Sequence, residues 1–279
     1  MHEAKRWISL RPPVDNTDWL KTAAIIFVSA GHFGFFFVDD DRWWSVFGRL
    51  AAPPFFFLIG FAQSKTVPLY WIWIGIILTL LESWNADWTW VAPNILLSFV
   101  LIRLARPSVQ RGLEEYGWAA FALLVCGFVV AQPIASKLVD YGAEGWLWAL
   151  FGLCQRRFAD NNLPAKRAVG SQDPPRPAHA LKVDWGVMGL AACIAAAVVF
   201  VWQEQQEYSF PPLHLIVFIA GLIVLCVSLR VFERAPSRIQ PPEPVAGVLR
   251  FIGRRTFEIY AIQLAGSELL VKLVPDLAP

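Results

Sequence analysis

The sequence predicts an all-α, polytopic integral membrane protein, folded as a single helical bundle of about nine transmembrane helices over residues 1–279. Two observations predict this class. Hydrophobic residues make up 56% of the chain and charged residues only 16%, whereas soluble domains carry about 25% charged residues. Several uninterrupted apolar runs also approach the roughly 20 residues that a helix needs to cross a bilayer.

We expect nine membrane spans, with eight or ten as the alternatives, because the sequence contains nine apolar runs. They cover residues 22–38, 43–62, 69–83, 89–105, 117–135, 143–155, 184–202, 212–230 and 256–274. Basic residues precede the first run, as in a signal peptide, but the run continues to Val38 without a small-residue cleavage site, so we expect a retained anchor. In the second run, Pro53 and Pro54 should kink the helix and free backbone carbonyls beside a cavity.

The distribution of basic residues predicts the orientation. Arginines and lysines gather in alternate loops, after residues 62, 102, 155 and 229, whereas the opposite loops carry mainly acidic residues such as Asp140, Glu204 and Glu207. Positive charge marks the cytoplasmic side. We therefore expect a cytoplasmic N-terminus and, with an odd number of spans, a C-terminus outside.

Two long loops are expected on the cytoplasmic side. Residues 156–182 are rich in Pro, Ala, Asn and Arg and predict a mobile loop. Residues 231–248 contain four prolines and predict a semi-rigid connector. Their basic residues either set topology alone or form a docking surface for a polyanionic cytoplasmic ligand.

Several function classes have no support in the sequence. The four cysteines lie in apolar runs, without a C-x-x-C pair, and are interpreted as small packing residues. The chain has no metal-ligand spacing, no glycine-rich phosphate loop and no nucleophile elbow. We therefore expect neither a metal site nor a nucleic-acid partner.

Lys21 and His32 are the most informative polar pair, because ionisable groups in an apolar span are costly. They lie eleven residues apart, about three helical turns, and so share one helix face. Lys21 marks the inner border, where it either orders a site or only reaches the interface, and Thr17 is a candidate helix cap.

His32 and Arg49 are expected at nearly equal depth, because a tight loop at 39–42 joins their two antiparallel spans. Burial beside an arginine favours the neutral imidazole, the form that a general base needs. The alternative is that His32 only hydrogen-bonds a neighbouring helix.

These residues resemble a known family. Leu20-Lys21 and the apolar run to His32 are similar to the Lys/Arg-x10-His pattern of type 3 membrane acyltransferases, and the rest is closer to the TraX branch. Four further elements carry this resemblance: Gly48-Arg-Leu-Ala-Ala-Pro53-Pro-Phe-Phe-Phe57, Asn94-Ile-Leu-Leu97, Asp140-Tyr-Gly-Ala-Glu-Gly145 and Arg255-Thr-Phe-Glu-Ile-Tyr260.

The resemblance implies transfer of an acyl group, usually acetyl, from cytoplasmic acyl-CoA to a hydroxyl or amine on a glycan, a lipid or a protein. His32 would be the base, and Lys21 and Arg49 would order the site. We assign the donor phosphates to Arg254 and Arg255 because positive charge clusters beside the last span. The expected location is the cytoplasmic (inner) membrane of a bacterium, in contact with membrane lipid.

Two departures leave a second function open. The TraX branch has Asp before its histidine, where this chain has Gly31, and His in its final helix, where this chain has Gln263. Glutamine cannot act as a base. The alternative is therefore a catalytically degenerate accessory subunit that packs against a larger membrane complex. A transporter is less favoured, because no inverted repeat is visible.

Overall fold

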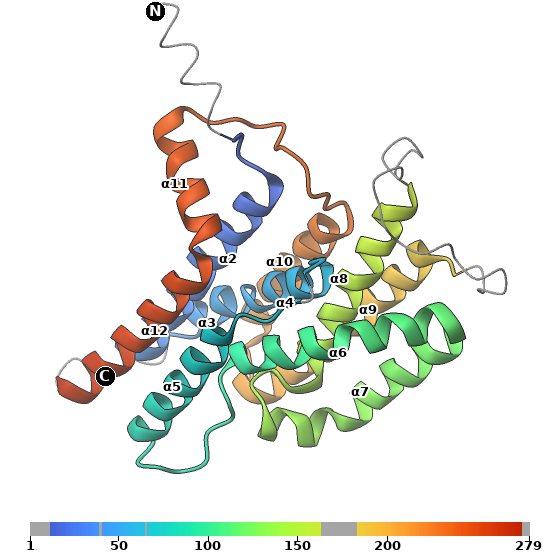
Figure 1. Cartoon of the computed structure of the whole chain (residues 1–279). Coiled ribbons are helices and arrows are strands. Elements are labelled where there is room, and N and C mark those ends of the chain that lie inside the picture. The colour runs from blue at the N-terminus through green and yellow to red at the C-terminus, as the bar shows by residue number, and fades with distance from the viewer. Residues whose placement is uncertain (1–11, 39–40, 65, 163–182, 275–279) are drawn as a thin grey trace, which may run out of the picture.

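The computed structural model describes residues 12–38, 41–64, 66–162 and 183–274 (Figure 1). Within these ranges the regular secondary structure is entirely helical. Five helical segments are long and apolar enough to cross a membrane: Asn16–Phe37, Arg42–Phe61, Trp118–Leu138, Trp185–Tyr208 and Pro212–Arg230. The second of these segments consists of two consecutive helices. The expectation of a helical membrane protein is thus confirmed.

Eleven named helices follow one another through the described residues. They are α2 (Asn16–Phe37), α3 (Arg42–Arg49), α4 (Ala52–Phe61), α5 (Leu69–Asn85), α6 (Ile95–Tyr116), α7 (Trp118–Leu138), α8 (Gly142–Asn162), α9 (Trp185–Tyr208), α10 (Pro212–Arg230), α11 (Glu243–Arg254) and α12 (Thr256–Leu273).

Helix α2 begins earlier than the apolar run. Its cap is Asp15, not Thr17, because the Asp15 carboxylate accepts from the backbone N–H of Asp18 at 2.8 Å. The Asp18 carboxylate accepts in return from the Asp15 N–H at 3.1 Å, which completes a capping box. The expected interruption of the second span is present, because α3 ends at Arg49 and α4 restarts with Pro53 and Pro54 in its first turn.

The core is built around α4 and α8, which approach closely at glycines. A Cβ at Gly60 would lie 1.9 Å from the carbonyl oxygen of Ala149, and one at Gly152 would lie 2.1 Å from that of Phe57. Small residues let membrane helices pack backbone against backbone. Phe57 and Trp148 are therefore fully enclosed, with α9 on the far side of α8.

A second group of helices stands beside this core. In Figure 1, α11 and α12 follow each other, with α2 and α5 alongside. The ring of Trp71 at the start of α5 stacks on Phe257 at the start of α12, and Lys272 near the end of α12 donates to the carbonyl of Trp84 near the end of α5. Helices α5 and α12 therefore run parallel.

Three expected boundaries were wrong: the start of the fourth span, the end of the sixth span and the end of the connector before the last span. Helix α6 begins at Ile95, not 89, because Pro93 precedes it and the Asn94 side chain caps it by accepting from Leu96 N–H. Helix α8 continues to Asn162, so residues 156–162 of the expected mobile loop are helical; residues 163–182 lie outside the described part of the chain.

The connector expected at 231–248 is also shorter. Its first part runs along the start of α2, where Asn16 N–H donates to the carbonyl of Ala235 at 3.0 Å and Ser237 N–H to that of Val14 at 2.9 Å. From Glu243 it is helix α11, whose Ala246 and Leu249 are buried against Val14. The apolar spacing of an amphipathic helix outweighs the prolines, which lie only in its first turn and before it.

Candidate functional site

One cavity of about 1030 Å³ is lined by residues from both ends of the helix group formed by α2, α5 and α12. We call one part of its lining the basic end, formed by Lys21, Arg103, Arg234 and Arg254. We call the other the acidic end, formed by Glu82, Asp140, Glu207 and Glu268. His32 and Arg49 also line this cavity. Ligand pockets typically enclose about 300–1,000 Å³, so this volume suits a large ligand.

His32 and Arg49 are brought together by two glycines. Gly31 of α2 and Gly48 of α3 face each other so closely that a Cβ at Gly31 would lie 2.7 Å from the Cα of Gly48. Each glycine immediately precedes one of the two cavity residues. The sequence expectation that His32 and Arg49 share one depth therefore agrees with the crossing point of their helices. Gly31 is a packing residue here, and a larger side chain has no room.

The His32 ring is half-buried between aromatic residues. Its centroid lies 5.7 Å from that of Tyr260 and 6.3 Å from that of Phe36. The Nδ1 atom is buried without a hydrogen-bond partner among the described residues. A buried polar atom of this kind is costly and therefore uncommon. The imidazole is thus not tied into a helix–helix hydrogen bond within the described part of the chain.

Tyr260 links the histidine to a polar chain that sequence reasoning missed. Its hydroxyl accepts from Asn94 Nδ2 at 3.3 Å, and the same Asn94 amide donates to the Glu82 carboxylate at 3.0 Å. Tyr260 and Glu82 both line the cavity. Asn94 belongs to the Asn94–Leu97 motif of the sequence analysis. Besides capping α6, its side chain hydrogen-bonds to Glu82 and Tyr260.

Arg49 is held by acidic partners. Its guanidinium makes ion pairs with Glu204 at 3.3 Å and with Glu207 at 2.6 Å. It also donates to the hydroxyl of Tyr208 and lies 4.6 Å from the centroid of that ring. The positive charge of Arg49 is therefore largely neutralised by these two carboxylates. Arg49 is better suited to holding α3 against α9 in the cavity wall than to binding an anion directly.

Glu204 and Glu207 correct a sequence expectation. Both were placed in an outer loop, but they lie in the last turns of α9, and the Glu204 side chain is 0% exposed. Buried carboxylates need a partner, and Arg49 supplies it. The three-residue spacing of Glu204 and Glu207 could have indicated one helix face. The apolar run was instead ended at residue 202, which left both residues in a loop.

Asp140 and Tyr141 complete the wall between α7 and α8. Burial raises the pKa of the Asp140 carboxyl to about 6, the nearby Arg49 lowers it in part, and Glu207 raises it further. Burial also raises the pKa of Tyr141 well above its ordinary value. Tyr141 adopts φ 62° and Gly142 φ 43°, and a Cβ at Gly142 would lie 2.6 Å from the N atom of Ser136. The turn therefore requires glycine at 142.

Lys21 is fixed at the basic end by α11. Its Nζ donates to the carbonyl oxygen of Gly253 at 3.0 Å, in the last turn of that helix. A cation is favoured there because the C-terminal carbonyls of a helix carry partial negative charge. Lys21 thus ties α2 to α11 while it lines the cavity.

The two arginines assigned to the donor differ. Arg254 lines the cavity, whereas Arg255 is not among the lining residues. The Arg255 side chain is 61% exposed and pairs with Glu258 at 3.0 Å. The structure thus brings Lys21, His32, Arg49 and Arg254 to one cavity, and it leaves Arg255 outside.

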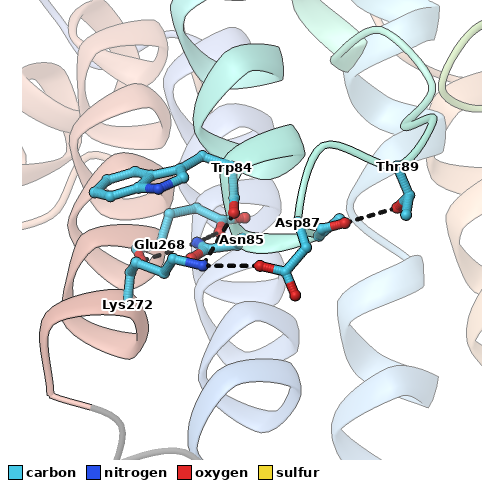
Figure 2. A network of polar contacts seen from close by, with 7 residues as sticks. Trp84, Asn85, Asp87, Thr89, Glu268 and Lys272 are labelled. Carbon is cyan, nitrogen blue, oxygen red and sulfur yellow. Dashed lines mark hydrogen bonds and ion pairs between the residues drawn. The ribbon is translucent and has the colours of Figure 1, made fainter.

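A clasp, formed by Trp84, Asn85, Asp87, Glu268 and Lys272, holds α5 and α12 together beside the acidic end (Figure 2). Lys272 donates to the Trp84 carbonyl at 3.1 Å and pairs with Asp87 at 3.3 Å. One turn back on α12, Glu268 accepts from the side-chain amide of Asn85. Asn85 and Glu268 line the cavity, so the clasp fixes its wall.

Gln263, where the resembling family has histidine, contacts α2 instead of the cavity. Its Oε1 accepts from the Ser29 hydroxyl at 3.0 Å, and it is not among the lining residues. Position 263 therefore joins two helices through a hydrogen bond.

Comparison with family models, with curated protein sequences and with solved structures finds no match for this chain.

Proposed function

We propose that this protein is a membrane-embedded acyltransferase that moves an acyl group, acetyl in the simplest case, from acyl-CoA to a hydroxyl or amine acceptor. One observation carries the proposal: a single cavity of about 1030 Å³ is lined by His32 and by the basic residues Lys21, Arg234 and Arg254. A basic end suits the phosphates of the donor, and a histidine without a protein partner on Nδ1 suits proton transfer.

The proposed reaction has one chemical step. His32 accepts the proton of the acceptor hydroxyl or amine while the acceptor oxygen or nitrogen attacks the thioester carbonyl carbon. The C–S bond then breaks, the acyl group stays on the acceptor, and CoA leaves as a thiol after taking up the proton. Arg49 positions the wall beside His32 through its ion pairs with Glu204 and Glu207.

The proposal includes an orientation. Besides the five long apolar helices, α5, α6, α8 and α12 would cross the bilayer, which gives nine spans. Lys21, Arg103 and Arg254 lie at one end of the bundle, so that end would face the cytoplasm, together with the N-terminus. A bacterial cytoplasmic membrane would provide acyl-CoA on that side. The acceptor, on a glycan, lipid or protein, would approach from the acidic end.

The test is thioester consumption by the purified protein in lipid nanodiscs, with a simple primary amine added as the acceptor. We expect His32→Ala to slow acetyl-CoA consumption by roughly 10²–10⁴-fold, the usual contribution of a general base. His214→Ala is the matched control, because His214 also has a buried Nδ1 without a partner among the described residues but does not line the cavity. Equal rates in the wild type and His32→Ala would exclude the catalytic role.

A second candidate is a non-catalytic accessory subunit of a larger membrane complex. The hydrogen bond between Gln263 and Ser29 favours it, because a position that carries histidine in the resembling family here joins two helices. Purification from native membranes in a mild detergent separates the two candidates. A stable stoichiometric partner, with no thioester consumption in the complex, would support the accessory role.

A further inference from the structure

An aromatic wall stands at the basic end of the cavity, formed by Trp71 and Phe257. The two rings stack at 5.3 Å between centroids with an interplanar angle of 8°. Tyr70 meets Phe257 edge to face at 5.2 Å. All three residues line the cavity. Because the rings come from the starts of α5 and α12, two helices fix this wall.

Arg103 of α6 lies over the same wall. Its guanidinium carbon is 4.8 Å from the centroid of the Trp71 ring. No carboxylate pairs with Arg103 within the described ranges, in contrast to Arg49. The Arg103 Nε and Trp71 Nε1 atoms are buried without hydrogen-bond partners in that part of the chain. Both residues line the cavity.

The surrounding charge favours an anion. Lys21, Arg234 and Arg254 join Arg103 at this end. The acidic residue in the lining nearby is Glu258, which is already paired with Arg255 at 3.0 Å. Planar rings stack on nucleobases, at about 1–3 kcal/mol per base, and guanidinium groups bind phosphate with paired N–H donors. The wall thus combines the two groups that recognise a nucleotide.

We propose that the wall of Trp71, Phe257 and Arg103 binds the adenosine bisphosphate part of the acyl donor, with the adenine against the aromatic rings and a phosphate on Arg103. The inference rests on the proposed function for its donor, and it adds binding residues that the sequence did not indicate. It also orients the donor. Lys21 lies at the basic end, beside the proposed nucleotide site, and His32 is the proposed base. The two residues are separated by about 16 Å along α2 at 1.5 Å per residue. The flexible arm of the donor, which joins its nucleotide to its thioester, would span this distance.

The experiment is calorimetric titration of 3′,5′-ADP and of inorganic phosphate into the full-length protein in nanodiscs. We expect 3′,5′-ADP to bind, and Trp71→Leu and Arg103→Gln each to weaken it at least about 10-fold, as expected for one stacked base or one charged hydrogen bond. Phosphate should bind far more weakly, and Trp71→Leu should leave that binding unchanged.

Two matched controls separate the site from general effects. Trp73→Leu removes a tryptophan that lies two positions along α5, is 66% exposed and does not line the cavity. Arg111→Gln removes an exposed positive charge from α6 that is also absent from the lining. Both should bind 3′,5′-ADP within about 2-fold of the wild type, because neither side chain lines the cavity.

Failure of the inference and failure of the proposed function give different results. Absence of 3′,5′-ADP binding, or equal binding by Trp71→Leu and Trp73→Leu, would overturn the nucleotide site, while His32-dependent consumption of acetyl-CoA could still stand. Conversely, Trp71-dependent binding of 3′,5′-ADP without any thioester consumption would support the nucleotide site and overturn the acyltransferase.

Discussion

Gly31→Ala tests whether the contact between α2 and α3 positions the site. The added Cβ would lie 2.7 Å from the Cα of Gly48, whereas carbon atoms in contact are separated by about 3.5–4.0 Å. The two helices must therefore move apart by about 1 Å. Overpacking of this kind costs about 1–3 kcal/mol. Because His32 and Arg49 adjoin the contact, the same shift displaces them relative to each other.

The expected functional effect is larger than the effect on stability. A misplacement of about 1 Å can slow a reaction by about 10²-fold. Thermal unfolding in detergent micelles and acetyl-CoA consumption measure the two effects. Gly266→Ala is the control, because a Cβ there meets no atom within 4 Å and should stabilise α12 by up to about 1 kcal/mol. If Gly31→Ala matched Gly266→Ala in both assays, the contact between Gly31 and Gly48 would not position His32 and Arg49.

Three further predictions concern stability. Asp140→Asn should raise the unfolding temperature, and more at pH 7.5 than at pH 5: the folded-state pKa of about 6 lies above the ordinary aspartate value of 3.8, so stability falls as pH rises between them; an equal gain at both pH values would contradict this. Glu204→Gln should destabilise by about 3 kcal/mol, because it removes a fully buried partner of Arg49, whereas Glu207→Gln, with 47% exposure, should change stability by at most about 1 kcal/mol; equal losses would contradict the burial argument. Gly60→Ala should unfold at a clearly lower temperature, because its Cβ would lie 1.9 Å from a backbone carbonyl oxygen of α8; an unchanged temperature would show that α4 and α8 can separate freely.

Features of the fold that depend on hydropathy, or on residue spacing within one segment, could be predicted from the sequence. The membrane class, the break before Pro53 and the matching depth of His32 and Arg49 all follow from local rules. The nine spans and the cytoplasmic N-terminus stay predictions, because five helices meet the length and composition of a span.

The contacts that could not be predicted from the sequence join helices that lie far apart in the chain. The pairing of Arg49 with Glu204 joins α3 to α9, and the stack of Arg103 on Trp71 joins α6 to α5. Periodicity gives the face of a helix but not its neighbour. Gly31 looked like a lost acidic group, and only the distance to Gly48 shows that the position has no room for a side chain.

The most direct test of the central claim is single-turnover release of free CoA from acetyl-CoA, with a simple primary amine as the acceptor, by the wild type and His32→Ala. Binding of 3′,5′-ADP, measured on the same samples, shows that the variant is folded and holds the donor. We predict equal binding and a release rate at least about 100-fold lower in His32→Ala. Equal binding with equal release would contradict this prediction, because His32 would then line the cavity without taking part in the chemistry.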